Sequence, residues 1–167
     1  MESVPSTYLG TIDIWPEGDP SQRYRHGVTL GFTIPPLTCT LSHATHVLDD
    51  VSADELAAAG SDAGESAFDM PLQCPSANVE VSLRMNDASG ANGTDGLLAA
   101  AAGSTAQGVQ IQLLRGGHPV QLGAGWLHGD SSKGSQVIPF SARYRRNADA
   151  LQPGLIRGEA VLTATYR

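Results

Sequence analysis

Two histidines and two aspartates just after the first cysteine are of the residue types that bind metal ions. His43, His46, Asp49 and Asp50 place nitrogen and oxygen ligands close together in the sequence. The H-x-x-H spacing suits neither a pair of ligands four apart on a helix nor a pair on one face of a strand. The sequence therefore predicts no metal site here.

The serine-containing loops also lack the spacing that nucleophilic catalysis needs. Residues 59–64 (AGSDAG) and 129–135 (GDSSKGS) match neither a G-x-S-x-G elbow nor a phosphate-binding loop. The remaining histidines, His26, His118 and His128, lie in turn-like surroundings and are expected to be exposed. Nothing combines a base, a nucleophile and an oxyanion donor, so we expect no catalytic residues, no cofactor and no enzymatic activity.

The chain contains two cysteines, Cys39 and Cys74, which are too few for a four-cysteine zinc site and are not spaced as C-x-x-C. A disulfide between them is the natural interpretation and implies an oxidising compartment, whereas two buried reduced thiols would fit a cytosolic protein. The first ten residues have neither the basic start nor the apolar run of a secretory leader. If the protein is exported, we expect that Met1 is not its original start.

Length and charge limit the function classes. A chain of 167 residues has room for one ordinary domain and a short second piece. Ten basic and 17 acidic residues give a net charge of −7, which repels phosphate backbones, so nucleic acid is a poor candidate partner. The charge is uneven, because residues 1–100 hold 14 acids and 3 bases, while residues 101–167 hold 3 acids and 7 bases.

Apolar and polar residues alternate along almost the whole chain. Side chains on a strand point to opposite faces in turn, so a period of two predicts half-buried β-strands. The first two runs flank a turn-rich PEGDPSQ segment and predict a hairpin or linker strands. The alternating apolar positions are Tyr8, Ile12, Ile14; Val28, Leu30, Phe32, Ile34; Phe68, Met70, Leu72; Val79, Val81, Leu83, Met85; Val109, Ile111, Leu113; Ile138, Phe140, Ala142, Tyr144; and Ala160, Leu162, Ala164, Tyr166.

Helix is expected to be scarce. The spacing of Ser52 and Glu55 matches a capping box and predicts one or two helical turns around residues 53–59. Residues 97–104 are ambiguous between a short helix and a strand. Short strands with one disulfide predict an all-β sandwich of the immunoglobulin type.

The strand count is one short of a complete sandwich. About six principal strands follow Cys39, and the last is followed by Arg167 alone. An uncovered sheet edge above apolar side chains is a hazard for aggregation. Either another chain supplies the missing strand, or the N-terminal segment folds back to cover the core.

The second half of the chain contains the stretches AQGVQIQLLRGGHPVQLG (106–123), IPFSARYRRN (138–147) and GLIRGEAVLTATYR (154–167). These resemble the C-terminal half of a chaperone–usher fimbrial subunit. The first half of the chain resembles the same family in PPLTCT (35–40) and FDMPLQC (68–74). Gly154 stands fourteenth from the end and Tyr166 is penultimate, as in the terminal strand motif of these pilins.

The resemblance implies an immunoglobulin-like fold that lacks its seventh strand. The groove left open is filled first by a strand of a periplasmic fimbrial chaperone and later by the N-terminal extension of a neighbouring subunit. It implies that an outer-membrane usher assembles the subunits, and that the protein ends in an extracellular fimbrium on a Gram-negative cell, serving adhesion. The residues assigned to binding the chaperone or donor strand are Gly154, Ala160, Leu162, Ala164, Tyr166 and Arg167.

The N-terminal part distinguishes two fimbrial roles. Residues 1–27 are expected to be a linker or the end of a preceding adhesin domain, and residues 28–167 the pilin domain that anchors a tip adhesin; receptor binding would then lie in the preceding domain. In the alternative role, a shaft or adaptor subunit, the apolar side chains of a donor strand are Val28, Leu30, Phe32 and Ile34. A self-contained β-sandwich carbohydrate-binding module is a further alternative.

Overall fold

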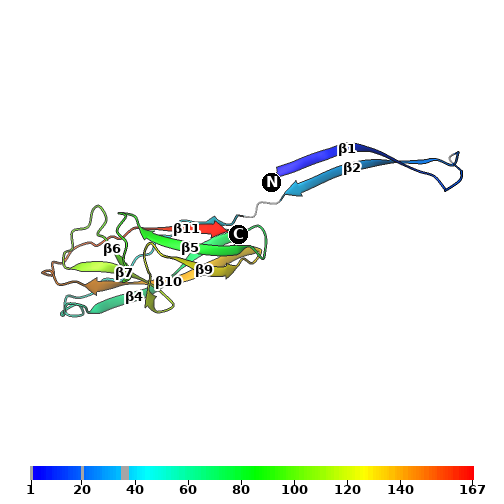
Figure 1. Ribbon diagram of the computed structural model, residues 1–167. Coiled ribbons are helices and arrows are strands. Elements are labelled where there is room, and N and C mark those ends of the chain that lie inside the picture. The colour runs from blue at the N-terminus through cyan, green and yellow to red at the C-terminus, as the bar shows by residue number, and fades with distance from the viewer. Residues whose placement is uncertain (1, 20, 35–37) are drawn as a thin grey trace. The chain divides into compact units, whose positions relative to one another are not determined.

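The computed structural model describes residues 2–19, 21–34 and 38–167, and within these ranges the chain forms strands, turns and loops but no helix (Figure 1). No helix that could span a membrane is therefore found among the residues described. The chain divides into two units, Met1–Pro36 and Leu37–Arg167. The predicted all-β fold is confirmed.

The first unit is a two-stranded antiparallel ribbon. Strand β1 (Glu2–Ile14) pairs with β2 (Tyr24–Ile34) from Ile14↔Tyr24 to Glu2↔Ile34, with two register shifts along the way. The turn between them includes a hydrogen bond from the Asp19 N–H to the Pro16 carbonyl. Of the two arrangements predicted for the N-terminal runs, the structure shows the hairpin.

The second unit has two antiparallel sheets. In the larger sheet the strand order is β3–β4–β10–β7–β6, with β8 paired to β7, and in the smaller sheet the order is β11–β5–β9. The bounds of the larger sheet are β3 Thr40–Leu41, β4 Asp62–Cys74, β6 Leu97–Leu98, β7 Val109–Arg115, β8 His118–Pro119 and β10 Gly134–Arg146. Those of the smaller sheet are β5 Glu80–Asp87, β9 Gly125–Asp130 and β11 Ala160–Tyr166.

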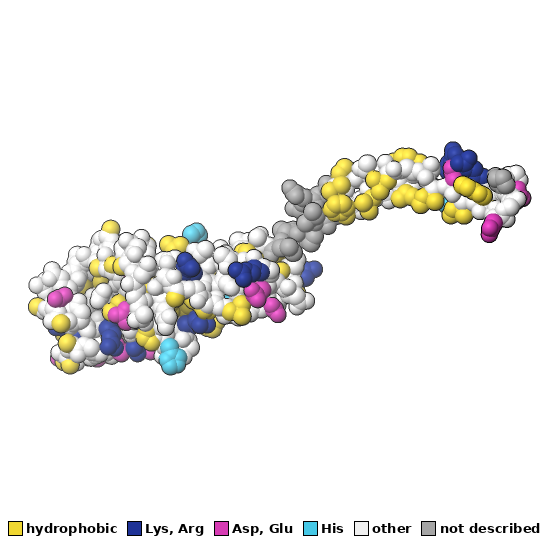
Figure 2. All heavy atoms as spheres, viewed as in Figure 1, with side chains coloured by type: hydrophobic (Ala, Val, Ile, Leu, Met, Phe, Trp, Pro, Cys, Tyr) yellow, Lys and Arg dark blue, Asp and Glu magenta, His cyan; other side chains and the backbone are white. Residues whose placement is uncertain are grey.

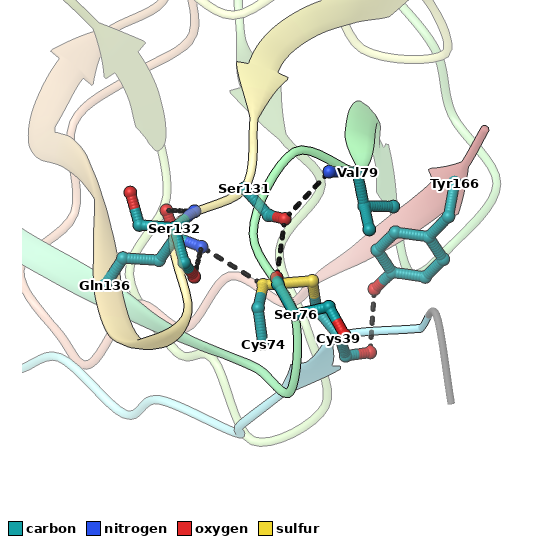
Figure 3. Close-up of a disulfide and its surroundings, with 8 residues drawn as sticks. All are labelled: Cys39, Cys74, Ser76, Val79, Ser131, Ser132, Gln136 and Tyr166. Carbon is teal, nitrogen blue, oxygen red and sulfur yellow. Dashed lines mark hydrogen bonds between the residues drawn. A yellow bond between two sulfur atoms is a disulfide. The ribbon is translucent and has the colours of Figure 1, made fainter. Parts of the chain in front are cut away.

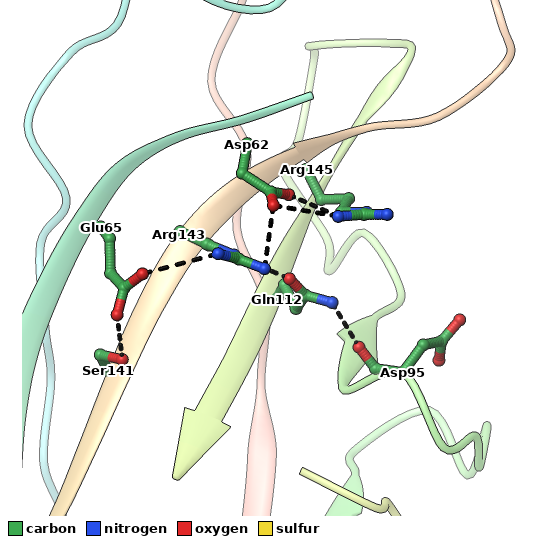
Figure 4. Close-up of polar contacts among 7 residues, drawn as sticks. All are labelled: Asp62, Glu65, Asp95, Gln112, Ser141, Arg143 and Arg145. Carbon is green, nitrogen blue, oxygen red and sulfur yellow. Dashed lines mark hydrogen bonds and ion pairs between the residues drawn. The ribbon is translucent and has the colours of Figure 1, made fainter. Parts of the chain in front are cut away.

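The core consists of the alternating apolar side chains of these strands. Leu72 of β4, Val81 and Leu83 of β5 and Ile138 of β10 are at most 1% exposed, and they belong to one cluster. The polar residues between them lie on the other face of the sheet, where Arg143 of β10 pairs with Asp62 at 2.9 Å and donates to the Gln112 side chain at 2.8 Å (Figure 4). The period-two pattern thus assigned the inward side chains of these strands correctly, but both faces of β7 are covered, because Gln112 and Leu114 are 3% and 1% exposed.

The helix predicted around residues 53–59 is instead a turn. The Glu55 carboxylate accepts hydrogen bonds from the Ser52 N–H and hydroxyl at 2.8 and 2.9 Å, which are contacts of a capping box. The chain does not continue as a helix, because Gly60 adopts a φ of +84° and its N–H bonds to the Arg146 carbonyl at 2.9 Å. This glycine turns the chain toward β4 before a second helical turn forms.

Two other segments differ from expectation. Residues 97–104 contain only the two-residue strand β6 and otherwise form a loop, which answers the ambiguity left by their composition. Strand β9 was not predicted, because Gly125 and Gly129 interrupt its pattern and the adjacent Trp126 and Leu127 break the alternation.

Asp87 is a buried carboxylate that joins the end of β5 to a neighbouring loop. It is 4% exposed and accepts hydrogen bonds from the N–H of Ala99 at 2.6 Å and the N–H of Ser89 at 2.7 Å. Burial acts to raise the pKa of Asp87, but these hydrogen bonds more than offset burial and hold the pKa below its usual value.

We expect Asp87→Asn to lower the free energy of unfolding by about 1.5–3 kcal/mol at pH 7, because the charged acceptor is lost. A carboxylate with a lowered pKa contributes stability above its unfolded pKa, and this contribution is lost as the pH falls through the folded value. Denaturant unfolding at pH 7 and pH 3 should therefore show the difference between wild type and variant shrinking in acid. Asp69→Asn, at an exposed position of β4, is the control. A stability difference between wild type and Asp87→Asn that does not change with pH would contradict the lowered pKa of Asp87.

Candidate strand-binding groove

One edge of β11 has no strand beside it among the described residues. The strand pairs with β5 from Ala160↔Asp87 to Tyr166↔Val81, and it is the last strand of the smaller sheet (Figure 1). Beyond the strand, Arg167 and Glu80 exchange two backbone hydrogen bonds of 3.0 Å. In an antiparallel ladder such pairs alternate with pairs whose N–H and C=O groups point the other way. The backbone groups that face the open edge therefore belong to Ala160, Leu162, Ala164 and Tyr166.

The opposite wall is formed by residues 41–48. Leu41 ends β3, and the Ser42 N–H still bonds to the Pro71 carbonyl of β4 at 3.2 Å. From His43 to Asp50 no backbone group makes a hydrogen bond within the part of the chain that is described. Two backbone segments with unused hydrogen-bonding groups thus flank one space.

That space is a cavity of about 420 Å³ between residues 41–48 and residues 158–162. Its floor is apolar and comes from four strands of the larger sheet and one of the smaller: Phe68, Met70, Met85, Leu98, Ile111, Leu113 and Ala142. The polar side chains that line it are those of Ser42, His43 and His46. The cavity has the shape and chemistry to receive alternate apolar side chains of an added strand, while the two walls offer backbone hydrogen bonds.

The side chains of β11 alternate as the sequence predicts. Leu162, Ala164 and Tyr166 are half-buried and pack against the core, whereas Val161, Thr163 and Thr165 are exposed. Ala160 is exposed but lines the cavity, and Arg167 is exposed beyond the end of the strand. Their roles in binding a donor strand or chaperone stay predictions.

Tyr166 closes one end of the groove. Its hydroxyl donates a 2.8 Å hydrogen bond to the Cys39 carbonyl, and this joins the end of β11 to the start of the opposite wall (Figure 3). The predicted disulfide is present, because Cys39 is bonded to Cys74 at the end of β4. Gln136 of β10 donates from its amide to the Cys74 sulfur at 3.0 Å. The wall, β4 and β11 therefore meet at this corner.

Gly154 does not line the cavity. It lies where residues 152–157 cross residues 104–107, and a Cβ there would come within 2.6 Å of the Ala106 nitrogen. The next residue, Leu155, donates its N–H to the Thr105 hydroxyl at 2.9 Å. Gly154 thus permits a close crossing of two loops; a role in strand binding stays a prediction.

Gly158 lines the cavity and was missed by the sequence analysis. A Cβ at this position would lie 2.8 Å from Cδ1 of Leu98 and 3.4 Å from Cδ1 of Ile111. Gly158 could have been predicted from the sequence, because it lies two residues before Ala160 and so continues the even-numbered series that runs to Tyr166. The apolar floor itself could not be predicted, since its residues come from strands far apart in the sequence.

The candidate donor residues lie in the other unit. Val28, Leu30 and Phe32 of β2 share one face of the hairpin, and Ile34 ends the strand. Their face also carries apolar residues of β1, and its large side chains are mostly about half exposed, at 49–61% for Tyr24, Leu30, Phe32, Ile12 and Ile14. Apolar side chains accordingly gather along the hairpin in Figure 2. The opposite face carries Tyr8, Thr11, Asp13, Arg25 and Thr29.

The structure does not gather His43, His46, Asp49 and Asp50 into one group of side chains. Within residues 2–19, 21–34 and 38–167, no group of three or more His, Cys, Asp or Glu side chains could hold an ion. His43 and His46 instead lie along the groove, and the His46 ring stacks on Phe68 with centroids 5.0 Å apart.

Comparison with known proteins identifies this arrangement. A sequence model of the family described as Fimbrial protein matches residues 28–167. The P pilus rod subunit PapA is similar in structure, with a TM-score of 0.58 and 19% identity over 77% of this chain and 99% of that chain. No curated protein matches the sequence.

Two further solved structures are similar over more of the chain. The CupB6 tip adhesin from Pseudomonas aeruginosa has a TM-score of 0.59 and 20% identity, over 91% of this chain and 48% of that chain. A chain from the structure of a chaperone–usher pilus has a TM-score of 0.57 and 18% identity, over 92% of this chain and 99% of that chain. The fold is accordingly the incomplete immunoglobulin-like sandwich of pilus subunits.

Replacing Tyr166 by Phe tests the corner of the groove. We expect the free energy of unfolding to fall by about 1 kcal/mol at pH 7, because one hydrogen bond to Cys39 is lost. Burial raises the pKa of Tyr166, so its stabilising contribution is present below the unfolded pKa of about 10 and is lost as the pH rises through the folded value. The gap in the free energy of unfolding between wild type and Tyr166→Phe should therefore narrow as the pH rises above about 10.

Denaturant unfolding with the disulfide intact measures this gap. The control is Tyr8→Phe, at a side chain that is 60% exposed in the other unit. It should change neither the free energy of unfolding at pH 7 nor the dependence of that free energy on pH. Equal stabilities of wild type and Tyr166→Phe at neutral pH would show that the hydroxyl does not hold the corner.

Proposed function

This chain belongs to the fimbrial protein family, and on that premise we propose that its groove is completed by a strand from another protein. The observation that carries the proposal is the open edge of β11 above an apolar cavity of about 420 Å³. An added strand would satisfy the edge groups of β11 and of residues 43–48, and its alternate side chains would fill the cavity. Fimbrial proteins of this family are structural, and their pili are extracellular.

The proposed partners act in sequence. A periplasmic chaperone would supply the strand first, and it would also contact Arg167 beyond the end of β11. An outer-membrane usher would then exchange the chaperone for the donor segment of a neighbouring subunit, on the surface of a Gram-negative cell. A shift of β11 by one residue against β5 would point Val161, Thr163 and Thr165 toward the cavity in place of Leu162 and Ala164. The register of β11 is therefore strongly specified.

Within the pilus, we assign the chain to the pilin domain of a tip adhesin. A donor strand needs both of its edges free, because it lies between β11 and residues 41–48. Strand β2 pairs with β1 along its whole length, from Tyr24 to Ile34, and has one free edge. As folded here, β2 is therefore a member of a hairpin rather than a segment ready for donation.

The one-sided apolar face of the hairpin supports the same assignment. An isolated two-stranded ribbon is marginally stable in water, and a row of half-exposed apolar side chains needs a hydrophobic layer to cover it. We propose that β1 and β2 are the last strands of a preceding domain, whose core this face completes. Receptor binding and adhesion would then belong to that domain.

A shaft or adaptor subunit is the second candidate. It is favoured by the likeness to the chaperone–usher pilus chain, which extends over 92% of this chain and nearly all of that one. In this role β1 would release β2, and Val28, Leu30, Phe32 and Ile34 would enter the groove of a neighbouring copy.

A peptide with alternating apolar residues tests the groove. At a concentration of about one hundred times Kd, a synthetic peptide of residues 27–38 should raise the Tm of the full chain by about 5–10 °C, because it binds the folded state only. Leu162→Lys, which places a charge on the cavity side of β11, should abolish this rise in thermal unfolding. Thr163→Lys, on the exposed side, is the matched control and should retain it. The peptide is used for its alternating apolar side chains and not because this segment is assigned as the natural donor. No rise at saturating peptide would contradict the groove proposal.

Self-association distinguishes the two fimbrial roles. For a tip-adhesin domain, we expect size-exclusion chromatography to show no oligomers that depend on both the groove and β2. For a shaft subunit, oligomers would form and would be lost with either Leu162→Lys or Phe32→Arg, because both the acceptor and the donor are needed. Thr29→Arg, on the polar face of the hairpin, controls for added charge. Oligomers lost with Phe32→Arg alone would indicate contact between apolar hairpin faces.

A further inference from the structure

A second cavity, of about 350 Å³, lies between the β7–β8 hairpin and the start of β9. Its lining comes from residues 115, 118–121 and 124–126, and none of these lines the groove beside β11. This cavity is therefore a separate site within the second unit, and what it binds does not depend on the strand-binding function proposed above.

The backbone directs two polar side chains toward this cavity. Leu113 of β7 belongs to the core, and Arg115, two residues further along the strand, is on the same face. Gly116 and Gly117 adopt φ values of +59° and +78°, which suit the tight turn of a two-residue hairpin. Arg115 is paired with His118 across this hairpin, so the two side chains lie next to each other on one face.

The Arg115 guanidinium is held in place without using its hydrogen-bond donors on a carboxylate. Its Cζ lies over the Trp126 ring at 4.8 Å from the centroid, and that ring makes an edge-to-face contact with Phe140 of the core, with centroids 6.4 Å apart. Stacking of this kind fixes the guanidinium plane and leaves the N–H groups at its edge free. Arg115 is exposed and forms no ion pair with any residue that the structure describes, so a ligand can reach it.

Other arginines of the same sheet have partners within the chain. Arg143 and Arg145 of β10 each pair with Asp62 at 2.9 Å. By contrast, no Asp or Glu is among the described residues that line the cavity at Arg115. The cavity thus carries uncompensated positive charge in a chain whose net charge is −7, and this favours an anionic ligand.

We propose that this cavity binds a small hydroxylated carboxylate, such as a sugar acid. A guanidinium can hold a carboxylate through two parallel N–H···O hydrogen bonds, and an imidazole N–H of His118 can add a further donor. The Gln121 amide both donates and accepts, which suits ligand hydroxyls, while Pro119 and Ala124 offer apolar contact to the body of the ligand. A volume of about 350 Å³ is at the small end of the range for ligand pockets.

An NMR titration of the full chain with sodium glucuronate tests this, with the ionic strength held constant by sodium chloride. We expect saturable changes in backbone amide shifts that are largest within residues 115–126. Glucose, which has hydroxyls but no carboxylate, should cause no saturable change. Arg115→Gln should weaken glucuronate binding by at least about tenfold, because charged hydrogen bonds are lost. Arg115→Lys keeps the charge without the forked donors and should also weaken binding, by a smaller factor.

The matched control is Arg157→Gln, which removes an exposed arginine outside the cavity and should leave the Kd for glucuronate unchanged. The inference would be overturned by the absence of a saturable shift within residues 115–126, or by equal Kd values for wild type and Arg115→Gln. Equal weakening by Arg115→Gln and Arg157→Gln would also overturn it, because the attraction would then come from overall charge and not from this cavity.

Discussion

The unpaired edge of β11 is the constraint around which the second unit is organised. Backbone N–H and C=O groups need hydrogen-bond partners, and four residues of this strand direct theirs toward a space rather than toward a neighbouring strand. Below that space, the apolar floor has no layer of side chains above it. A sheet edge and a core are therefore left open at the same place, so one added strand can complete both.

The two walls of the groove are not held equally. Strand β11 is fixed along its whole length by β5, while the opposite wall is tied down at one end only, by the pairing of Thr40 and Leu41 with β4 and by the contacts around Cys39. From His43 onward the wall relies on side-chain packing, of which the stack of His46 on Phe68 is the clearest case. The strand proposed to enter would thus lie between one wall with a full backbone ladder and one whose backbone groups from His43 to Asp50 make no hydrogen bond to the described residues.

Much of this fold could be predicted from the sequence, because a period of two is a strong signal where a strand has one buried face. Strands β4, β5, β7, β10 and β11 show it over several residues, and their inward positions were assigned correctly. Strand β9 carries two glycines and was missed, and the helix expected near Ser52 was stopped by Gly60. The open edge followed from the strand count and from the resemblance. The cavity floor did not, because it depends on how strands distant in sequence are brought together.

The disulfide also has a mechanical consequence. The chain enters the second unit beside Cys39, next to the two-residue strand β3, which alone would peel away under little force. The covalent bridge passes a pull on this connection directly to Cys74 at the end of β4. Because β4 is paired with β10 from Cys74 to Asp62, the pull then acts on a strand with a long ladder of hydrogen bonds and not on the two-residue strand β3 alone. A subunit built in this way can bear tension where its two units are joined.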